Sequence, residues 1–307
     1  MTGKVEILLA TYNGEHYLRE QLDSLLEQDY NNWVVRAFDD VSTDDTYRIL
    51  EEYREKYPDK FILKKNEKGF GSAKKNFMEL IKNSSCDYVM CCDQDDVWLP
   101  NKISLTLDAM KTHEQENMPI LVHTDLKVVD SNLKVLSESF FAHSNFRKTF
   151  ALNEILIQNF VTGCTMMMNR SMVALMSRVE DCNRILMHDW LASVLATGVG
   201  KVVFVDTQTM LYRQHAINSV GAKKYGFALL VSKLKENKMK ESLIDTTLQA
   251  KEIAELYRDI LKEENYQIIH QYGMLWEKNK MQRIRFYLKH KVLKKGFPRK
   301  VCQLIVG

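Results

Sequence analysis

The sequence predicts an α/β fold built on a mostly parallel sheet, and three observations support this prediction. Short apolar segments alternate four times with segments of helical apolar spacing in the first 110 residues. Each apolar segment ends in turn-forming polar residues. Beyond residue 221, apolar residues recur only at helical spacing. Alternation of this kind gives parallel strands joined by right-handed crossovers, with helices on both faces of the sheet.

The first half of this pattern contains four strands, each followed by a helix. The strands are expected at residues 5–10, 33–38, 61–63 and 88–92. The helices are expected at residues 15–28, 46–57 and 73–81, and a fourth begins near Pro100, because proline suits the first turn of a helix. Ser72 is expected to cap the third helix.

The pattern changes beyond residue 117. Short strands are expected at residues 120–123, 127–130, 134–137, 161–168, 201–206 and 209–213. Helices are expected at residues 151–158, after a cap at Ser171, and from residue 185 to 197, and then at 225–236, 242–262 and 266–276. We therefore expect a domain over residues 1–220, with halves 1–117 and 118–220, followed by a helical C-terminal region over residues 221–307.

The composition is that of a globular protein, with 45% hydrophobic and 27% charged residues among 307. Six cysteines show neither paired C-x-x-C spacing nor zinc spacing, which favours reduced thiols in the cytosol. We expect no signal peptide, and no segment has the roughly 20 apolar residues that a spanning helix needs. From residue 277 onward ten Lys and Arg oppose one Glu, so this tail carries +9 and the remainder −6.

Carboxylates gather where the predicted strands end. Asp93 and Asp95 follow the fourth apolar segment directly, and at that spacing they can face one side of a loop. Oxygen ligands of this kind hold a divalent cation, which can in turn neutralise a departing diphosphate. The alternative is a solvated acidic turn in which Asp96 caps the next helix. Further polar clusters at the other strand ends favour the site, because parallel sheets bind ligands at their carboxyl edge.

Together these residues resemble the family 2 glycosyltransferases of the GT-A fold, over roughly residues 4–220. The matching segments are Thr11-Tyr12-Asn13, Asp39 through Thr46, Asp93-Gln94-Asp95-Asp96, Thr162-Gly163-Cys164, His188-Asp189-Trp190 and Tyr212-Arg213-Gln214-His215. The forms Asp-Gln-Asp-Asp-Val-Trp, His-Asp-Trp and Tyr-Arg-Gln-His are most similar to bacterial rhamnosyltransferases that build cell-wall and capsular polysaccharides. The GT-A fold is a Rossmann-like sheet flanked by helices.

The resemblance implies a nucleotide-diphosphate sugar donor, with dTDP-rhamnose favoured and a UDP-hexose or UDP-N-acetylhexosamine as the alternative. The donor-binding residues that it implies are Ala10, Thr11, Tyr12, Asp39, Asp40, Gly71, Asn76, Asp93, Gln94 and Arg213. Tyr12 would lie on the base, and Asp40 would accept its imide N–H. Asp39 would hold the loop or the ribose instead, and an Asx turn with a helix cap is an alternative for the whole Asp39-Asp40 segment.

Mn²⁺ or Mg²⁺ is the implied cofactor, with Asp95, Asp93 and His215 as the metal site and Asp95 as the favoured direct ligand. Arg213 and His215 could stabilise the leaving diphosphate. The alternatives are that Arg213 is a surface cation and that His215 is an ordinary loop residue.

Asp189 is the implied general base of an inverting transfer, because one carboxylate suffices to take the proton of the acceptor hydroxyl. His188 and Trp190 are the candidate acceptor residues. Many relatives have Glu-Asp where this chain has His188-Asp189, so His188 could bind the acceptor, tune Asp189 or cap the helix. Trp190 could stack on a sugar or belong to the core.

The basic tail mixes cations with apolar residues between 283 and 295, as segments on anionic membrane surfaces do. Such a tail fits a lipid-linked glycan acceptor and a cytoplasmic protein that is peripheral on the inner face of the cell membrane. The alternatives are a solvated helix face and a homodimer contact. Nucleic acid is excluded as a partner, since the body is acidic and no recognition motif is present.

Two other classes of function fit the sequence less well. A nucleotidyltransferase on a related sheet would carry a Gly-rich, cationic loop after the first strand, which Thr11 to Glu15 lacks. A non-catalytic scaffold of the same fold would not be expected to keep Asp95, Asp189 and Arg213 together.

Overall fold

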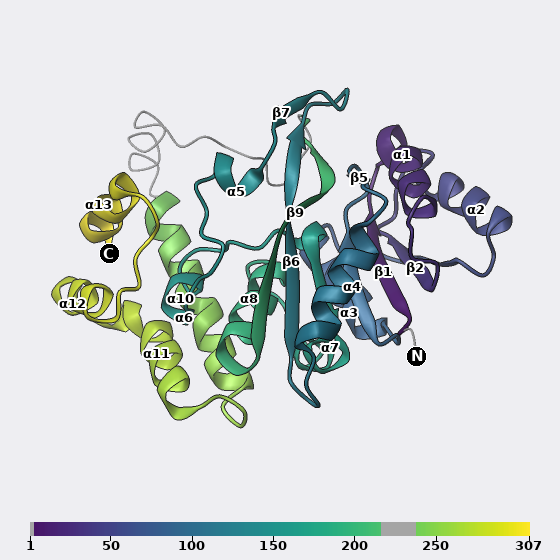
Figure 1. Ribbon diagram of the computed structural model, residues 1–307. Coiled ribbons are helices and arrows are strands. Elements are labelled where there is room, and N and C mark those ends of the chain that lie inside the picture. Colours follow the sequence, from purple (N-terminus) through teal and green to yellow (C-terminus); the bar gives the residue numbers. More distant parts are fainter. Residues whose placement is uncertain (1–2, 216–237) are drawn as a thin grey trace.

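The computed structural model describes residues 3–215 and 238–307, which form one large sheet with helices on both faces (Figure 1). The strands are β1 Val5–Thr11, β2 Trp33–Asp39, β3 Phe61–Lys65, β4 Tyr88–Cys92, β5 Val97–Trp98, β6 Ile120–Val129, β7 Val135–Ser137, β8 Met166–Asn169 and β9 Lys201–Arg213. The helices are α1 Glu15–Leu26, α2 Thr46–Lys56, α3 Ala73–Asn83, α4 Lys102–His113, α5 Phe140–His143, α6 Leu152–Ile155, α7 Arg170–Met176, α8 His188–Val199, α10 Lys238–Leu256, α11 Glu263–Gly273, α12 Lys280–His290 and α13 Phe297–Val306, with short 3-10 turns at Gly163–Thr165 and Leu275–Glu277.

The strand order is β3-β2-β1-β4-β8-β6-β9-β5, and β7 pairs with β6. The four strands from β3 to β4 are parallel, as predicted, whereas β8 runs antiparallel to both of its neighbours. This happens because the chain reaches β8 over the carboxyl edge of the sheet and enters the strand from that side. The predicted fold class is confirmed, with a sheet that is mixed rather than mostly parallel.

The central strands are buried on both faces, which explains their nearly continuous apolar sequence. In β1 the side chains of Val5, Ile7, Leu8 and Leu9 have no exposed surface. Glu6 is the charged residue in this strand. It is fully buried as well, and it pairs with Arg36 of β2 at 2.5 Å. Its second oxygen accepts the Ser85 N–H at 2.7 Å, so this charge is compensated on both sides.

The second half of the sheet differs from the prediction in its boundaries. The expected pairs of strands at 120–123 with 127–130, and at 201–206 with 209–213, are the continuous strands β6 and β9. The register of the β6–β9 pairing shifts around Asp125. The polar residues at this point make each strand look like two separate strands in the sequence. The predicted strand at 161–168 is a 3-10 turn followed by β8, and the helix expected at 151–158 is shortened to α6.

Three predicted helix starts also need correction. The side chain of Asn169, rather than that of Ser171, caps α7 by accepting the Met172 N–H. Ser72 occupies the N-cap position of α3, but its side chain makes no capping hydrogen bond. Pro100 lies before α4 and outside its first turn, since the helix starts at Lys102.

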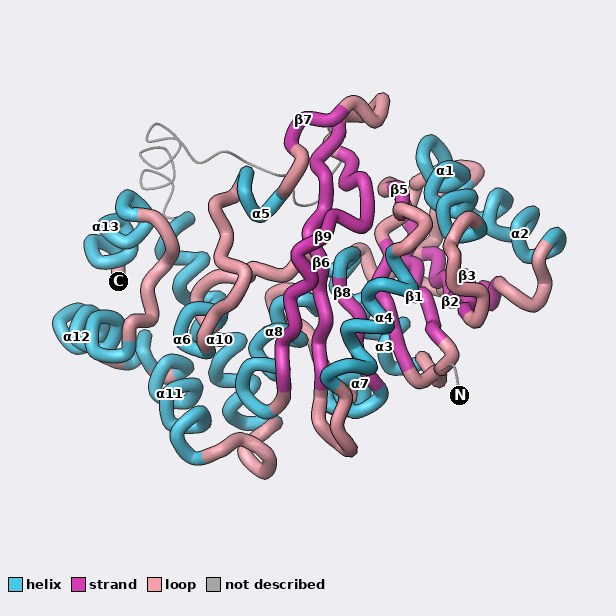
Figure 2. Tube along the Cα trace, viewed as in Figure 1, coloured by secondary structure: helices cyan, strands magenta, loops and turns pink. Residues whose placement is uncertain are grey.

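The C-terminal helices pack onto the sheet domain and share its core (Figure 2). Leu243 and Ile253 of α10 belong to the same buried cluster as residues of α3, α7 and α8. Tyr257 is fully buried, and its hydroxyl donates to the Leu175 carbonyl at 2.9 Å. The helix expected at 225–236 and the boundary expected near residue 220 lie outside the described residues. No helix of the described ranges is both long and apolar enough to cross a membrane.

Candidate active site

A cavity of about 1580 Å³ runs along the carboxyl edge of the sheet. Its walls come from the loops after β1, β2 and β4, from the loop before β8 with the start of α8, and from the segment that leads into α13. The predicted site residues that line it are Ala10, Thr11, Tyr12, Asp40, Gly71, Asn76, Asp93, Gln94, Asp95, His188, Asp189, Trp190 and His215. Asp39 and Arg213 do not line it.

Asp39 holds the loop after β2 in place. Its buried carboxylate accepts the Ser42 N–H at 2.9 Å, the Ser42 hydroxyl at 2.5 Å and the Thr11 hydroxyl at 3.1 Å. These bonds tie the end of β2 to the end of β1, which lies beside it in parallel register. Asp39 therefore has the loop-holding role that the sequence left open, and it is not brought to the donor side of the cavity.

Asp40 and Asn76 line the cavity next to this loop. The Asp40 carboxylate accepts the N–H groups of Phe70 and Gly71 at 2.6 and 2.9 Å. Gly71 has a φ of +62°, which a residue without Cβ adopts easily. The Asn76 amide donates to the Phe38 carbonyl at 2.9 Å. Carboxylate oxygens have several lone pairs, so Asp40 retains acceptor capacity for a further N–H.

Tyr12 and Gln94 join the loops after β1 and β4. The Gln94 side chain accepts the Tyr12 N–H at 2.8 Å and donates to the Tyr12 carbonyl at 2.9 Å. A Cβ at Gly14 would lie 2.3 Å from the end of the Gln94 side chain, so that side chain would have to move from its present position. The Tyr12 ring is 57% exposed at the mouth of the cavity, where a planar ligand can stack on it.

Asp95 and His215 are brought together by the antiparallel pairing of β5 with β9. The His215 Nε2 atom lies 2.7 Å from Asp95 Oδ2. Burial, together with the nearby charges of Asp95 and Asp189, raises the pKa of Asp93. A cation beside these carboxylates would relieve that repulsion, and carboxylate and imidazole donors suit Mn²⁺. The predicted metal residues therefore fit a divalent ion.

Arg213 lies behind the Asp95 loop and is 1% exposed. Its guanidinium donates to the carbonyls of Asp95 and Ser131 at 2.8 and 2.6 Å, pairs with Glu20, and lies 4.4 Å from the ring centre of Tyr17. Contrary to the expectation that it reaches the diphosphate, it supports the loop that carries Asp95. The reason is strand alternation, because Tyr212 points into the cavity and its neighbour must point away.

Asp96 belongs to a buried cluster beneath the cavity. It accepts the Arg213 N–H at 3.0 Å, and its carboxylate, that of Asp93 and the Cys164 thiol lie within 4.8 Å of one another. Burial raises the pKa of Asp96 and that of Cys164. The hydrogen bond from Arg213 to Asp96 links the loop after β4 to the end of β9.

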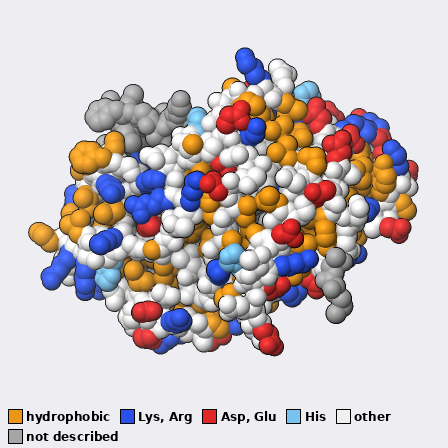
Figure 3. All heavy atoms as spheres, viewed as in Figure 1, with side chains coloured by type: hydrophobic (Ala, Val, Ile, Leu, Met, Phe, Trp, Pro, Cys, Tyr) orange, Lys and Arg blue, Asp and Glu red, His pale blue; other side chains and the backbone are white. Residues whose placement is uncertain are grey.

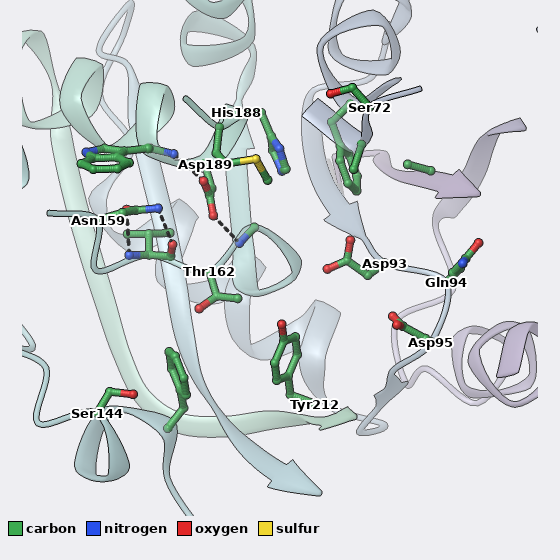
Figure 4. Close-up of a pocket in the computed structure, with 18 of the residues that line it drawn as sticks. Ser72, Asp93, Gln94, Asp95, Ser144, Asn159, Thr162, His188, Asp189 and Tyr212 are labelled. Atoms are coloured by element: carbon green, nitrogen blue, oxygen red, sulfur yellow. Dashed lines mark hydrogen bonds between the residues drawn. The ribbon is translucent and has the colours of Figure 1, made fainter. Parts of the chain in front are cut away.

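Asp189 is the second residue of α8, and its carboxylate faces the cavity opposite Asp93 (Figure 4). It accepts the Gly163 N–H at 3.1 Å and the Trp190 N–H at 2.6 Å. Burial raises the pKa of Asp189 to about 7, against the lowering effect of these two hydrogen bonds. A carboxylate with this pKa can take a proton from a substrate hydroxyl at neutral pH.

His188 and Trp190 flank this carboxylate. The His188 ring is 3% exposed and stacks on Phe77 with 4.2 Å between ring centres. Within the described ranges neither ring nitrogen has a hydrogen-bond partner, and burial lowers the pKa of His188 to about 3, so the ring is neutral. The Trp190 indole N–H donates to the Ile155 carbonyl at 2.6 Å, which fixes that ring at the cavity wall.

Several lining residues had no role in the prediction. Thr162 and Tyr212 occur in the quoted motifs, and their place in those motifs was the available signal. Asn159 had no signal in the sequence. Further unexpected residues include Lys294, Lys295 and Arg299, which belong to the tail expected at a membrane surface and which line the cavity.

A family model described as Glycosyl transferase family 2 matches residues 6–175, more than half of the chain. The chain belongs to glycosyl transferase family 2. The predicted family and enzyme class are thereby confirmed, and the nucleotidyltransferase and scaffold alternatives receive no support.

Named relatives agree with this membership. The family 2 glycosyltransferase described here is 30% identical over 223 residues to the dTDP-rhamnosyl transferase RfbG of Shigella flexneri, which covers 70% of this chain and 74% of the relative. It is also 30% identical over 107 residues to the UDP-Glc:alpha-D-GlcNAc-diphosphoundecaprenol beta-1,3-glucosyltransferase WfgD of Escherichia coli, over 34% of this chain and 40% of the relative.

Solved structures show the fold. The S. aureus TarS 1–349 structure is similar with a TM-score of 0.57 and 18% identity, over 88% of this chain and 70% of that one. The mannosyltransferase PcManGT from Pyrobaculum calidifontis, solved in complex with GDP-Man and Mn²⁺, gives a TM-score of 0.57 and 15% identity over 94% and 74% of the two chains. The GT-A fold that the resemblance implied is confirmed.

Proposed function

We propose that this family 2 glycosyltransferase inverts the configuration of the sugar it transfers, from a nucleotide-diphosphate donor to a hydroxyl of a lipid-linked glycan in cell-surface polysaccharide synthesis. One observation carries the proposal. The carboxylate of Asp189, with a pKa of about 7, faces Asp93 across the cavity, and Asp95, which contacts His215 at 2.7 Å, follows Asp93 in the same loop. A base and a site for the leaving diphosphate thus face a shared space.

The reaction needs one displacement at the anomeric carbon. Asp189 takes the proton of the acceptor hydroxyl while that oxygen attacks from the face opposite the diphosphate. The new carbon–oxygen bond forms as the bond to the diphosphate breaks, and the nucleoside diphosphate departs. A second catalytic carboxylate is unnecessary, because the proton has one destination and the leaving group needs only charge neutralisation.

The residues proposed to hold Mn²⁺ or Mg²⁺ are Asp95, Asp93 and His215. The ion supplies positive charge to the leaving diphosphate. Arg213 contributes indirectly, since its guanidinium bonds to the Asp95 carbonyl and keeps the loop in position.

We further propose that residues 1–117 hold the donor and that residues 118–220 hold the acceptor. Tyr12 would stack on the base and Asp40 would accept its imide N–H. The named activity of the relative RfbG supports dTDP-rhamnose as the donor. The named activity of WfgD keeps a UDP-hexose or UDP-N-acetylhexosamine as the alternative.

A peripheral position on the cytoplasmic face of the cell membrane is also proposed, and exposed apolar side chains on α12 and α13 support it. Phe297, Val301 and Ile305 recur every four residues on α13 and are 80, 38 and 55% exposed. Met281 of α12 is 80% exposed. Cations lie among orange apolar side chains over these two helices, on the left of Figure 3. Contact with a second copy of the chain is the alternative use of this face.

A donor screen tests the proposal. Thermal unfolding is measured with a panel of nucleotide sugars, with and without Mn²⁺. A donor at one hundred times its Kd should stabilise the fold by about 2.7 kcal/mol. Selective stabilisation by dTDP-rhamnose with Mn²⁺ is expected, and a UDP-sugar in its place would select the alternative donor. Absence of stabilisation by every nucleotide sugar would overturn the proposal.

A further inference from the structure

The cavity is lined by side chains of both charges. Its carboxylates are those of Asp40, Asp93, Asp95 and Asp189. Its cations include Lys294 and Lys295, from the connection between α12 and α13, and Arg299, from the first turn of α13. A neutral sugar acceptor requires no such group of cations, so their presence in the cavity calls for a separate explanation.

This cationic wall is held in place by a set of backbone hydrogen bonds. The N–H of Lys294 donates to Gln303 Oε1 at 2.8 Å, and the N–H of Lys295 donates to Gln158 Oε1 at 2.9 Å. Gln303 is fully buried, and its amide also donates to the Val292 carbonyl at 2.8 Å. The connection is therefore part of the folded cavity wall.

Lys294 is the buried member of this group. It is 7% exposed, and its Nζ lies 3.3 Å from the Ile157 carbonyl and 3.4 Å from the Ser242 hydroxyl. Burial and the nearby Arg147 lower the pKa of Lys295, although Glu154 acts in the opposite direction. Glu154 is itself paired with Arg147 at 2.7 Å. An anion bound in the cavity would be attracted by the positive charges on this wall.

The first turn of α13 adds to the same wall. Gly296, Pro298 and Arg299 line the cavity, so the start of this ten-residue helix borders it. The positive end of the helix dipole at such a position favours an anion. Phosphate is the anion that lysine, arginine and a helix start bind together most readily.

We propose that Lys294, Lys295 and Arg299 bind a phosphate or diphosphate group of the acceptor. The inference rests on the proposed function, and it assigns to the acceptor a chemical group and a binding wall distinct from the Asp95 and His215 site. The acceptor sugar would then lie between this wall and Asp189. The phosphate belongs to a lipid carrier or to the glycan itself.

The test compares Lys295→Ala/Arg299→Ala with a matched control, Lys289→Ala/Lys300→Ala. The control removes two cations from the same region that do not line the cavity. Binding of inorganic pyrophosphate is measured by calorimetry with a chelator present, so that no metal site can contribute. We expect the wild type and the control to bind alike, and the cavity variant to bind at least about tenfold more weakly, the loss of one to two charge-assisted bonds.

Farnesyl diphosphate and glycerol 3-phosphate, tested in the same way, separate the two sources of phosphate. Stronger binding of the first assigns the site to a lipid carrier, and stronger binding of the second assigns it to a phosphate in the glycan. No pyrophosphate binding by the wild type, or equal binding by both variants, would overturn the inference. Thermal stabilisation of both variants by a nucleotide sugar is measured independently. If neither variant nor the wild type were stabilised, the proposed function would fail, whatever the outcome for pyrophosphate.

Discussion

The chemistry of Asp189 follows from two opposing effects at a single residue. Burial raises its pKa, and the N–H groups of Trp190 and Gly163 lower it, which leaves a value of about 7. A general base works best when its pKa is near the working pH, because it is then both largely ionised and a good proton acceptor. An exposed aspartate would be ionised but a much weaker base.

Asp189→Asn should lower the transfer rate by roughly 10²–10⁴-fold while leaving donor binding intact. In the wild type the ionised form is active, so kcat/KM should fall as the pH drops through about 7 and level off above it. Initial rates of nucleoside diphosphate release between pH 5 and 9 check this. Asp108→Asn, an exposed carboxylate of α4, is the matched control. Wild-type activity in Asp189→Asn would contradict the assignment.

At the same scale, His215→Ala should raise the Mn²⁺ concentration needed for half-maximal activity. We expect this concentration to rise by about tenfold or more, because mutating even the outer-shell partners of a metal lowers metal affinity by that factor. His270→Ala on the exposed surface of α11 is the control and should behave as the wild type. An unchanged metal requirement in His215→Ala would remove this residue from the metal site.

At the scale of elements, the start of α8 and the turn before β8 form one unit. The Gly163 N–H donates to Asp189, and a Cβ at Gly163 would lie 2.6 Å from His188 Nε2. Such a contact is too short, so the His188 ring, the turn or the helix start must move. The Thr-Gly-Cys motif is thus explained by close packing against the start of α8.

Gly163→Ala should therefore reduce activity by about a hundredfold, as small displacements of catalytic groups do, with nucleotide-sugar binding retained. The control is Gly198→Ala in α8, where the new Cβ meets only the Leu261 side chain at 3.3 Å. Activity and circular dichroism of the two variants are compared. Full activity of Gly163→Ala would show that the turn has more freedom than its contacts imply.

Another element, the C-terminal end of α12, stores backbone strain at Lys291, which has a φ of +54°. Lys291→Gly should stabilise the protein by up to about 1 kcal/mol, because glycine adopts this conformation freely. Lys289→Gly, inside the same helix, should instead destabilise by about 1 kcal/mol. Urea unfolding measures both, and a loss of stability in Lys291→Gly would contradict the expectation.

At the scale of the whole molecule, the C-terminal helices combine two surfaces. One side of the α12–α13 connection lines the cavity, and exposed apolar residues of α13 face outward. A protein bound to a membrane through this outward side would hold the cationic wall near the lipid surface. This arrangement fits an acceptor that remains attached to a lipid.

Phe297→Asp/Ile305→Asp should weaken binding to anionic vesicles by at least about tenfold, since burying each apolar side chain contributes roughly 1.5–3 kcal/mol. Vesicle co-sedimentation measures the effect, with Leu136→Asp on β7, 56% exposed, as the control. Equal binding of the double variant and the control would contradict the membrane proposal. Sedimentation velocity of the same proteins shows whether this face joins two copies of the chain instead.

The sequence by itself determined the fold class, the first four strands and the part of the cavity lining that lies in the family motifs and at the strand ends. Local patterns were sufficient there, because continuous apolar strands and their polar ends are adjacent in the chain. Residues 88–92 form β4 as predicted, and Asp93, Asp95 and Asp189 all line the cavity. The family motifs were likewise local, and the family was confirmed by the profile over residues 6–175.

Only the tertiary structure decided which side chains reach the cavity. Arg213 points away from the cavity because successive side chains of β9 point to opposite faces of the sheet. The Asp39 carboxylate is occupied by hydrogen bonds within its own loop. The pairing of Asp95 with His215 joins residues that are 120 positions apart. Lys295 and Arg299 enter the cavity because the C-terminal helices pack back onto the sheet domain. Such contacts depend on long-range packing and strand register, and neither leaves a local pattern in the sequence.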